Sequence, residues 1–578
     1  MGGPSPMPVG PALPPAQLEG WELLVGPLTG KSILCLSDRA LLVAALAQRC
    51  AHACVVSPPR SPGTGSTLPG GEWAWHNVEI VTHDALQARI QSNGLARFDG
   101  LVFSRPRVTA TPGHVAELPD LLRSIRPALR DGAFVLVVVP NRLGLTSDRV
   151  RAGFRSAEAW SSRALLDLVR GMGTSAPTIH PMLIDAEGRI SEVLAPTGYR
   201  ATKNVSLTRE RIKQWFWGPR SAHWFAPALA CVGWIGPPRP TVIDSVARAL
   251  ARGDGLLHWV QYLVLRSGKV IATFARSRQA GAEQVVVVTR DPLAISRRVR
   301  EAATLQYLAE YLPTSLSGLL PRVLNRFEVD GNECFVLQRI PGVTADAVVP
   351  ELDTVTRASL RFLIAVHRAT AVQRVMCDDD WRSLLGPIFD SAVARNKGVA
   401  AELRELEARV RAQLVSQVWV AVCSHGDFKI ENVMYDPQSF EITGVIDWEH
   451  ALIDGFPYID LAYLLTYNRM LHGQSWLQAA RALLLGNVSA QEALIELQYW
   501  EASAVPVRLV PALRALVIVH HIGVRWHGQW AEQMEGDLAA MLSDCIAMVK
   551  VSASASAPAD QYPRQATAGR GIPSPAVK

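Results

Sequence analysis

Two short polar signatures, joined by a predicted β-hairpin, constrain this chain of 578 residues more than any other feature. The first is HGDFKIEN at residues 425–432, and the second is IDWE at residues 446–449. The apolar runs around residues 434–435 and 440–446 predict two antiparallel strands, with Asp436 in the turn between them. Such a hairpin would bring the two signatures together as neighbouring loops.

The residue types in these loops suit a magnesium-dependent phosphoryl transfer from ATP. This reaction needs little covalent help from protein, but it needs an oriented hydroxyl, a bound metal and neutralised oxygen charge. Asp427 can receive the hydroxyl proton, and four residues separate it from Asn432. The amide oxygen of Asn432 and the carboxylate of Asp447 are the hard oxygen ligands that Mg²⁺ prefers. The two loops therefore predict one reaction centre.

The two signatures resemble the HGDxxxxN and IDWE motifs of the aminoglycoside phosphotransferase and choline kinase-like family of small-molecule kinases. The resemblance implies a bilobal, protein-kinase-like fold. It also implies that Asp427 is the catalytic base, that Asn432 and Asp447 bind the metal, and that His425 braces the loop. Lys429 is then expected to neutralise the transferring phosphoryl group, as the lysine in the similar loop of many protein kinases does, or else to be a solvated loop charge.

The chain before the first signature follows the order of a kinase N-terminal lobe. Three strands are predicted first, at residues 259–266, 270–276 and 284–289. One long helix at 292–312 follows them, and two more strands are predicted at 321–327 and 334–338. By the same resemblance, residues 339–342 form the hinge whose backbone groups hydrogen-bond adenine, and Gln338 and Ile340 are the binding candidates there. Long helical segments further on predict a mostly helical second lobe.

One family feature is missing, namely the third-strand lysine that pairs with a helix carboxylate and holds the donor phosphates. Its position falls near Val287 or Val288. Arg290 lies two residues past Val288, on the same face of a strand. We expect Arg290 either to reach Glu301 and a phosphate or to be an exposed charge at the strand end.

Upstream of residue 236, short β-type runs alternate with helical stretches, which predicts a parallel, doubly wound sheet. The order resembles the class I methyltransferase fold, with residues 178–184 and 228–234 as closing antiparallel strands. That family's glycine turn and acidic residue are missing, because residues 37–39 are Ser-Asp-Arg and the second strand ends at Ser57 before two prolines. We expect a degenerate domain without methyl transfer, with a structural or partner-docking role.

Composition divides the chain into four predicted segments. Residues 1–18 and 551–578 are rich in small residues and proline without apolar periodicity, so we expect both to be disordered. Three prolines within residues 236–240 separate two different patterns. We therefore expect an α/β methyltransferase-like domain at 19–236 and an α+β kinase-like domain at 241–550.

Charge and hydropathy exclude several classes of protein. The net charge of +6 is small for this length and its basic residues are scattered, so nucleic-acid binding is not expected. The apolar runs are too short to span a bilayer, and the N-terminus lacks the order of a signal peptide, so we expect no membrane partner and a cytoplasmic location. The eight cysteines form no CxxC pair and are expected to be buried thiols.

We therefore expect an ATP- and Mg²⁺-dependent phosphotransferase that acts on a hydroxyl of a small molecule, such as a sugar, an amino alcohol or an aminoglycoside-like compound. The alternative is a nucleotide-binding pseudokinase whose N-terminal domain docks a protein partner. That alternative explains the missing lysine, whereas the retained Asp427 argues against it. A methyltransferase with a kinase-like appendage would require the glycine turn that the sequence lacks.

Overall fold

A computed structural model describes residues 21–37, 40–57, 77–92, 97–104, 118–141, 160–184, 190–194, 226–251, 257–265, 269–276, 283–344, 351–525 and 535–554. The segment 1–18, predicted to be disordered, lies outside the described residues, and so do residues 38 and 39 of the expected glycine-free turn. The chain forms two compact units. Unit 1 comprises Met1–Ala347 and Asn432–His450, and unit 2 comprises Val348–Glu431 and Ala451–Lys578.

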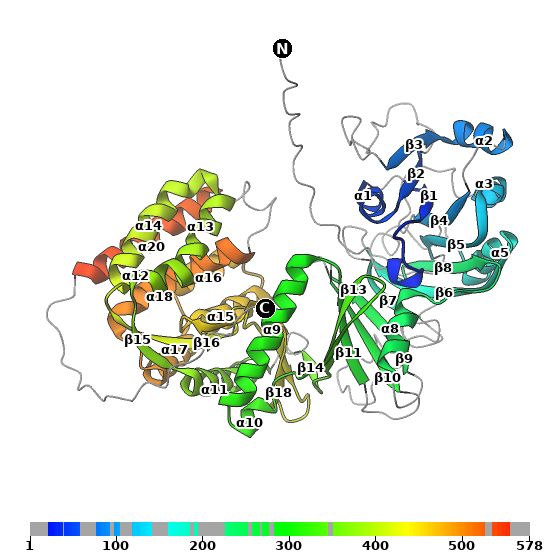
Figure 1. The fold of residues 1–578 in the computed structure, drawn as a ribbon. Helices are drawn as coiled ribbons and strands as arrows, with labels where there is room; N and C mark the ends of the chain where they lie inside the picture. Colours follow the sequence, from blue (N-terminus) through cyan, green and yellow to red (C-terminus); the bar gives the residue numbers. More distant parts are fainter. Residues whose placement is uncertain are drawn as a thin grey trace, which may run out of the picture. The chain divides into compact units, whose positions relative to one another are not determined.

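Unit 1 is built on a 13-stranded sheet with the order β12-β13-β11-β10-β9-β7-β6-β8-β5-β4-β1-β2-β3 (Figure 1). Its strands are β1 (Ser32–Leu36), β2 (His52–Ser57), β3 (Val78–Thr82), β4 (Phe98–Ser104), β5 (Leu129–Pro140), β6 (Thr174–Ile184), β7 (Ile190–Leu194), β8 (Ala228–Ile235), β9 (Leu257–Val264), β10 (Val270–Arg276), β11 (Glu283–Thr289), β12 (Val323–Val329) and β13 (Asn332–Gln338). Its longer helices are α1 (Ala40–Arg49), α2 (His83–Gln91), α3 (Leu118–Ile125), α5 (Ser162–Gly171), α8 (Val242–Leu250) and α9 (Pro292–Tyr311), and α10 (Thr314–Ser317) is a single turn.

The first half of this sheet is doubly wound, as the sequence predicted. Strands β3, β2, β1, β4 and β5 are parallel neighbours, and β8 and β6 then close the sheet in the antiparallel sense. Along β1, Ile33 and Cys35 join one apolar core with α1, whereas Leu34 and Leu36 join a second core with α3 and α5. Because side chains alternate across a strand and both faces are covered, the strand is apolar throughout.

The sheet continues across the segment in which we predicted a domain boundary. Strand β7 pairs with β9 in an antiparallel register of Glu192 with Leu263, Val193 with Tyr262 and Leu194 with Gln261. One apolar core extends along the same face from the first strands to β13, and α8 packs into it. The predicted boundary after residue 236 therefore does not coincide with the division between compact units, because the proline segment leads from β8 into α8 without interrupting the core.

The second half of the sheet has the predicted order of strands around a long helix. Strands β9 to β13 pair in the antiparallel sense, and α9 starts at Asp291, whose side chain accepts hydrogen bonds from the amides of Leu293 and Ala294. The predicted hairpin is also present, as β17 (Val433–Tyr435) and β18 (Ile442–Val445), and β14 (Val343–Thr344) pairs with β17. Asp436 stabilises the turn by accepting from the amides of Gln438 and Ser439.

Unit 2 is mostly helical, as predicted. Its helices are α11 (Leu352–Thr370), α12 (Asp378–Asp380), α13 (Gly386–Arg395), α14 (Ala400–Leu414), α15 (Ile459–Leu471), α16 (Trp476–Leu484), α17 (Ala490–Ser503), α18 (Val510–His520) and α20 (Glu535–Ser554). A small sheet contains β15 (Val372–Val375), β16 (Val418–Ser424) and β19 (Leu452–Gly455). The C-terminal segment that we expected to be disordered from residue 551 begins within α20, and residues 555–578 lie outside the described residues.

Burial agrees with the expectation that the cysteines are buried thiols, whereas one stretch of the chain is longer and more apolar than we expected. Every cysteine except Cys377 is buried. Among the described residues, one helical stretch, Val507–Val524, is long and apolar enough to cross a membrane by length and composition, and 67% of it is buried inside the fold. A core helix of a folded domain has the same composition.

Candidate active site

One buried carboxylate holds the loop that carries Asp427. Asp460, in the first turn of α15, accepts hydrogen bonds from the amide of His425 at 2.7 Å and from the amide of Gly426 at 2.8 Å. The ring Nδ1 of His425 accepts in turn from the amide of Asp427 at 3.3 Å. The loop is therefore braced from two sides, and Asp427 itself is 1% exposed.

Asp460 is itself oriented by a histidine and a tyrosine. The hydroxyl of Tyr499 accepts from the amide of Tyr458 at 2.7 Å and lies 2.8 Å from Nδ1 of His367. Nε2 of His367 lies 3.2 Å from Oδ2 of Asp460, and because an ionised carboxylate can only accept, this nitrogen is the donor. Burial raises the pKa of Asp460, but the bonds from His367 and the loop amides outweigh burial and leave the pKa below its ordinary value.

Lys429 faces the candidate base. Its Nζ lies 3.7 Å from Oδ2 of Asp427 and 3.1 Å from Oε2 of Glu431, and it lies 5.1 Å from the ring centroid of Tyr467. Burial lowers the pKa of Lys429, but the two carboxylates raise it further, so the net pKa is above its ordinary value. The ammonium is thus charged beside Asp427, which is the arrangement expected if it neutralises a transferring phosphoryl group.

The two candidate metal ligands lie at the same end of the β17–β18 hairpin. Val433 pairs with Val445, and the amide of Ile446 donates to the carbonyl of Asn432 at 2.9 Å. Asn432 therefore directly precedes β17, and Asp447 follows the end of β18 beside it. Asp447 has a φ of +67°, a left-handed conformation that is costly for a residue with a side chain and that is typical of functional sites. The oxygen donors fit Mg²⁺, and the Asp447 side chain is 33% exposed.

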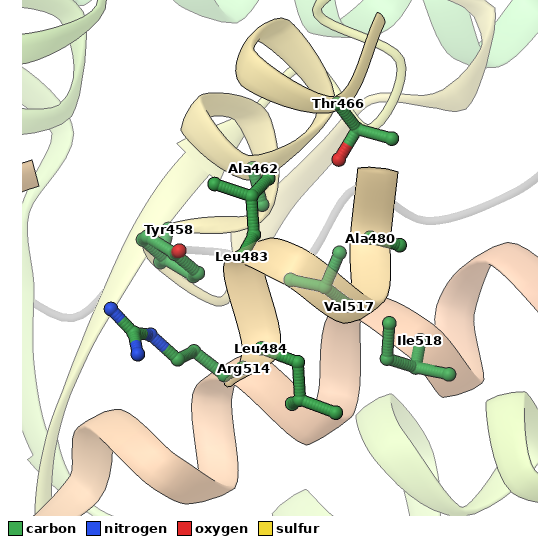
Figure 2. Close-up of a pocket in the computed structure, with 9 residues that line it drawn as sticks. All are labelled: Tyr458, Ala462, Thr466, Ala480, Leu483, Leu484, Arg514, Val517 and Ile518. Atoms are coloured by element: carbon green, nitrogen blue, oxygen red, sulfur yellow. The ribbon is translucent and has the colours of Figure 1, made fainter. Parts of the chain in front are cut away.

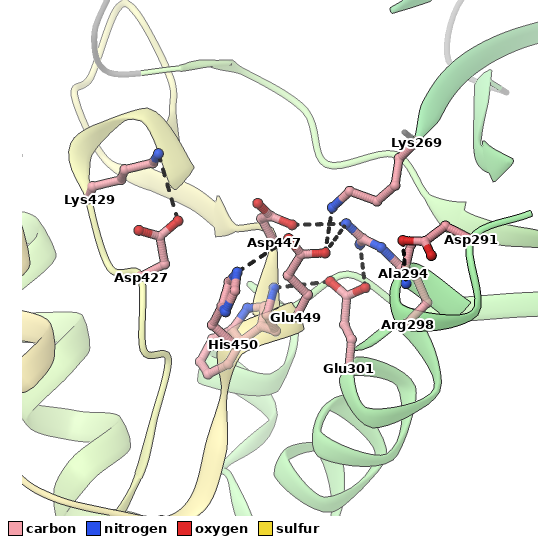
Figure 3. Close-up of polar contacts among 11 residues, drawn as sticks. Lys269, Asp291, Ala294, Arg298, Glu301, Asp427, Lys429, Asp447, Glu449 and His450 are labelled. Atoms are coloured by element: carbon pink, nitrogen blue, oxygen red, sulfur yellow. Dashed lines mark hydrogen bonds and ion pairs between the residues drawn. The ribbon is translucent and has the colours of Figure 1, made fainter. Parts of the chain in front are cut away.

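A buried ion cluster in unit 1 holds Asp447 (Figure 3). Nη2 of Arg298, on α9, donates to Oδ1 of Asp447 at 3.0 Å and to Oε2 of Glu449 at 3.1 Å, and its Nη1 bonds to Glu301. The ammonium of Lys269 bonds to the same oxygen of Glu449. Glu301 also accepts from the amide of Trp448 at 3.0 Å. Helix α9 is thereby tied to the segment that carries Asp447.

The electrostatics of this cluster keep its charges paired. Burial lowers the pKa of Arg298, but Glu301, Asp447 and Glu449 raise it above its ordinary value. Burial raises the pKa of Glu449, but His450, Lys269 and Arg298 bring it well below its ordinary value. Burial also raises the pKa of Glu301. Arg298 and Glu449 are therefore charged, and removing either one would leave an unpaired charge inside unit 1.

The predicted contact between Arg290 and Glu301 is wrong. Nε of Arg290 donates to Oδ1 of Asn332, and its Nη2 donates to the carbonyl of Asp330, each at 2.7 Å. The strand β11 ends at Thr289, so the two-residue alternation no longer directs the Arg290 side chain, and the β12–β13 turn offers it acceptors instead. The partner of Glu301 is Arg298, whose i,i+3 spacing on a helix was the signal available in the sequence.

The hinge candidates have different surroundings. Gln338 is exposed, and its amide donates to the carbonyl of Arg322 at 2.8 Å. Ile340 is buried against Gly444, where an added Cβ would lie 2.5 Å from its Cγ2. A role for either residue in binding adenine stays a prediction.

One pocket of unit 2 lies among α15, α16 and α18 (Figure 2). It is lined by Tyr458, Ala462, Thr466, Ala480, Leu483, Leu484, Arg514, Val517 and Ile518. Most of these side chains are apolar, and Arg514 is engaged by Glu496 at 2.8 Å. None of the candidate catalytic residues lines this pocket, so it contributes nothing to the site described above.

Comparison with known families finds a match for the part of the chain that carries these residues. Residues 266–495 match the model of the phosphotransferase enzyme family, abbreviated APH. The C-terminal region of this chain therefore contains a domain of that family, as the two signatures predicted.

Individual relatives cover only part of the chain. The curated streptomycin 3''-kinase of Streptomyces griseus is 30% identical over 178 residues, which make up 28% of this chain and 62% of that protein. The chain thus spans less than two thirds of the relative that it matches.

Two kinds of solved structure resemble parts of this fold. One is an aminoglycoside phosphotransferase from Streptomyces rimosus, with 17% identity, a TM-score of 0.32, and coverage of 49% of this chain and 97% of that chain. The other is an S-adenosylmethionine-dependent methyltransferase from Archaeoglobus fulgidus, with 12% identity, a TM-score of 0.24, and coverage of 36% and 87% respectively.

Proposed function

We propose that this chain is an ATP- and Mg²⁺-dependent phosphotransferase that transfers the γ-phosphoryl group to a hydroxyl of a small molecule. The observation that carries the proposal is the pair of preorganised carboxylates. Asp427 lies on a loop whose two preceding amides are held by Asp460, and Asp447 lies at a hairpin end held by Arg298. Phosphoryl transfer requires mainly that the protein position the reactants and stabilise the charge of the transferring group.

Each candidate residue has a defined task in this reaction. Asp427 accepts the proton of the acceptor hydroxyl, whose oxygen forms the new bond to the γ-phosphorus while the bond to the β–γ bridging oxygen breaks and ADP leaves. Lys429 neutralises charge on the transferring group. Asn432 and Asp447 would hold Mg²⁺, which when bound neutralises the donor phosphates. Glu301 maintains the position of the Asp447 segment through the amide of Trp448.

The acceptor class is proposed from the family and from one relative. That relative is named for its action on streptomycin, so aminoglycosides come first in a test, followed by amino alcohols and sugars. The acidic residues of α17 give little guidance, because Glu492 is bonded to Arg469 and Glu496 is bonded to Arg514 and Tyr458. They are therefore already engaged within unit 2.

The test is ADP release by the full-length chain with Mg·ATP and a panel of hydroxyl compounds, comparing wild type with Asp427→Asn. The variant should lose about 10²- to 10⁴-fold in kcat, the range for a general base, with unchanged ATP binding. Asp379→Asn, an exposed aspartate of α12, is the matched control and should behave as wild type. Equal turnover in Asp427→Asn and wild type would reject the proposed base.

A nucleotide-binding pseudokinase is the second candidate function. It is favoured by the valines near the expected lysine position and by the Arg298 guanidinium that bonds to Asp447. This candidate predicts calorimetric binding of nucleotide together with no ADP release from any acceptor on the panel. Detected turnover with any of these acceptors excludes it.

A further inference from the structure

The lysine expected on β11 is absent, but another lysine, Lys269, lies beside the end of that strand. Lys269 directly precedes β10, and the pairing of Val270 with Val288 places Lys269 opposite Thr289, at the end of β11. The residues at the expected lysine position, Val287 and Val288, are buried and apolar. A long side chain that starts beside the last residue of β11 can reach the same end of the sheet.

Lys269 belongs to the cluster that holds the candidate metal ligand. It is 3% exposed, and its ammonium shares Oε2 of Glu449 with Nη2 of Arg298. The same Nη2 contacts Oδ1 of Asp447 at 3.0 Å, so one guanidinium nitrogen links the Lys269–Glu449 pair to Asp447. The Asp447 side chain is 33% exposed, whereas those of Lys269, Arg298, Glu301 and Glu449 are nearly fully buried.

The two cations of the cluster differ in how many of their hydrogens already bond to carboxylates. Both terminal nitrogens of Arg298 bond to carboxylates, and its planar fork fixes their directions. The ammonium of Lys269 has three hydrogens, and Glu449 is its one hydrogen-bond partner within the described residues. Three carboxylates, those of Glu301, Asp447 and Glu449, bond to these two cations.

We propose that Lys269 makes the contact to the donor phosphates that a lysine on β11 would otherwise make, and that Arg298 is a positioning residue for Asp447. This inference rests on the proposed phosphotransferase function. Lys269 turns one hydrogen toward the phosphate oxygens and keeps Glu449 as its second partner. The task of one strand lysine is thereby divided between a lysine that directly precedes β10 and an arginine of α9.

The competing explanation is that Lys269 only neutralises Glu449. In that case its loss lowers the stability of unit 1 but weakens adenosine, ADP and ATP binding equally. If Lys269 contacts the phosphates, its removal instead weakens the binding of ATP more than that of ADP, and that of ADP more than that of adenosine. The ratio of ATP affinity to adenosine affinity therefore separates the two roles, and it can be measured without catalysis.

The experiment is calorimetric titration of the full-length chain with adenosine, ADP and ATP, with Mg²⁺ and again with EDTA. Lys269→Met should weaken ATP binding about 10- to 100-fold, the range for losing a charged hydrogen bond, and should leave adenosine binding unchanged. Arg326→Met, which removes an exposed arginine of β12 that pairs with Glu333, is the matched control. Arg290→Met tests the position that the sequence suggested.

Each outcome has one meaning. Equal ATP affinity in wild type and Lys269→Met, or the loss appearing in Arg290→Met instead, overturns the inference and leaves the phosphotransferase proposal standing. Wild type that neither binds ATP nor releases ADP rejects the proposed function itself. Should Lys269→Met fail to fold, the paired change Lys269→Met with Glu449→Gln removes both charges, and the same selective loss of ATP binding is expected of it.

Discussion

At the residue scale, the candidate base depends on a carboxylate that is distant in sequence. Asp460 lies 33 positions beyond Asp427, is fully buried, and accepts from two successive amides of the loop. His367 bonds to Asp460, and Tyr499 holds His367 in turn. A buried carboxylate with several donors is stable only while it is ionised, so this network has a defined dependence on pH.

Asp460→Asn should destabilise the full-length chain by about 1–3 kcal/mol, because one loop amide or His367 loses its acceptor in a buried place. The folded-state pKa of Asp460 lies below its ordinary value of 3.8, so its stabilisation is present above about pH 4 and is lost as pH falls through the folded pKa. Urea unfolding between pH 7 and pH 3 should show that the difference in free energy of unfolding between wild type and variant becomes smaller as the pH falls. A difference that stays constant, or an equal effect of Asp379→Asn, would contradict this account.

At the scale of elements, the β17–β18 hairpin packs closely on the segment before β14 at one glycine, Gly342. Gly342 has a φ of +102°, and a Cβ there would lie 2.5 Å from the carbonyl of Tyr435 and 2.6 Å from Oγ1 of Thr443. The next residue, Val343, pairs with Tyr435. The hairpin that ends at Asp447 is therefore packed directly on the segment predicted to bind adenine.

Gly342→Ala should cost more stability than Gly331→Ala, although both glycines have a positive φ. Gly331, with a φ of +71° in the β12–β13 turn, has no atom within 4 Å of an added Cβ, so only a conformational cost of about 1–2 kcal/mol applies. Gly342→Ala adds a forced backbone shift of about 1–3 kcal/mol. Denaturant unfolding of the two variants measures the difference. Equal losses would mean that the hairpin and β14 are not tightly joined.

At the scale of the whole molecule, the two sequence patterns share one sheet. Strand β9 opens the kinase-like part, and its outer edge is covered by β7 of the preceding part. Apolar residues from both parts, including Phe134 and Val286, belong to one core. Because an uncovered strand edge beside an open apolar core is a site of aggregation, we expect the kinase-like part to need the N-terminal part for stability.

A fragment of residues 237–578 should therefore aggregate or melt at a clearly lower temperature than the full chain. A fragment of residues 21–578 is the matched control and should keep the melting temperature of the full chain, because it retains β7 and the strands beside it. Size-exclusion chromatography and thermal unfolding of the two fragments provide the measurement. A monomeric 237–578 fragment that melts like the full chain would show that the edge of β9 needs no partner strand.

The sequence alone was sufficient for the features that depend on local pattern. Alternating apolar runs located most strands to within a few residues, and α9 and the β17–β18 hairpin are close to their predicted bounds. Turn chemistry at Asp436 and the N-cap at Asp291 act between residues a few positions apart, so they can be read directly. The two signatures also identified the family of the C-terminal region.

Tertiary structure alone decided which distant charges meet. The ion cluster joins Lys269 just before β10, residues of α9, and Asp447 and Glu449 after β18, which are separated by up to 180 positions. The burial of Lys269 follows from packing that no periodicity encodes. The contact of Arg290 with the β12–β13 turn and the pairing of β7 with β9 have the same origin. Helix and strand patterns depend on near neighbours along the chain, whereas ion pairing and strand order depend on how whole elements fill one core.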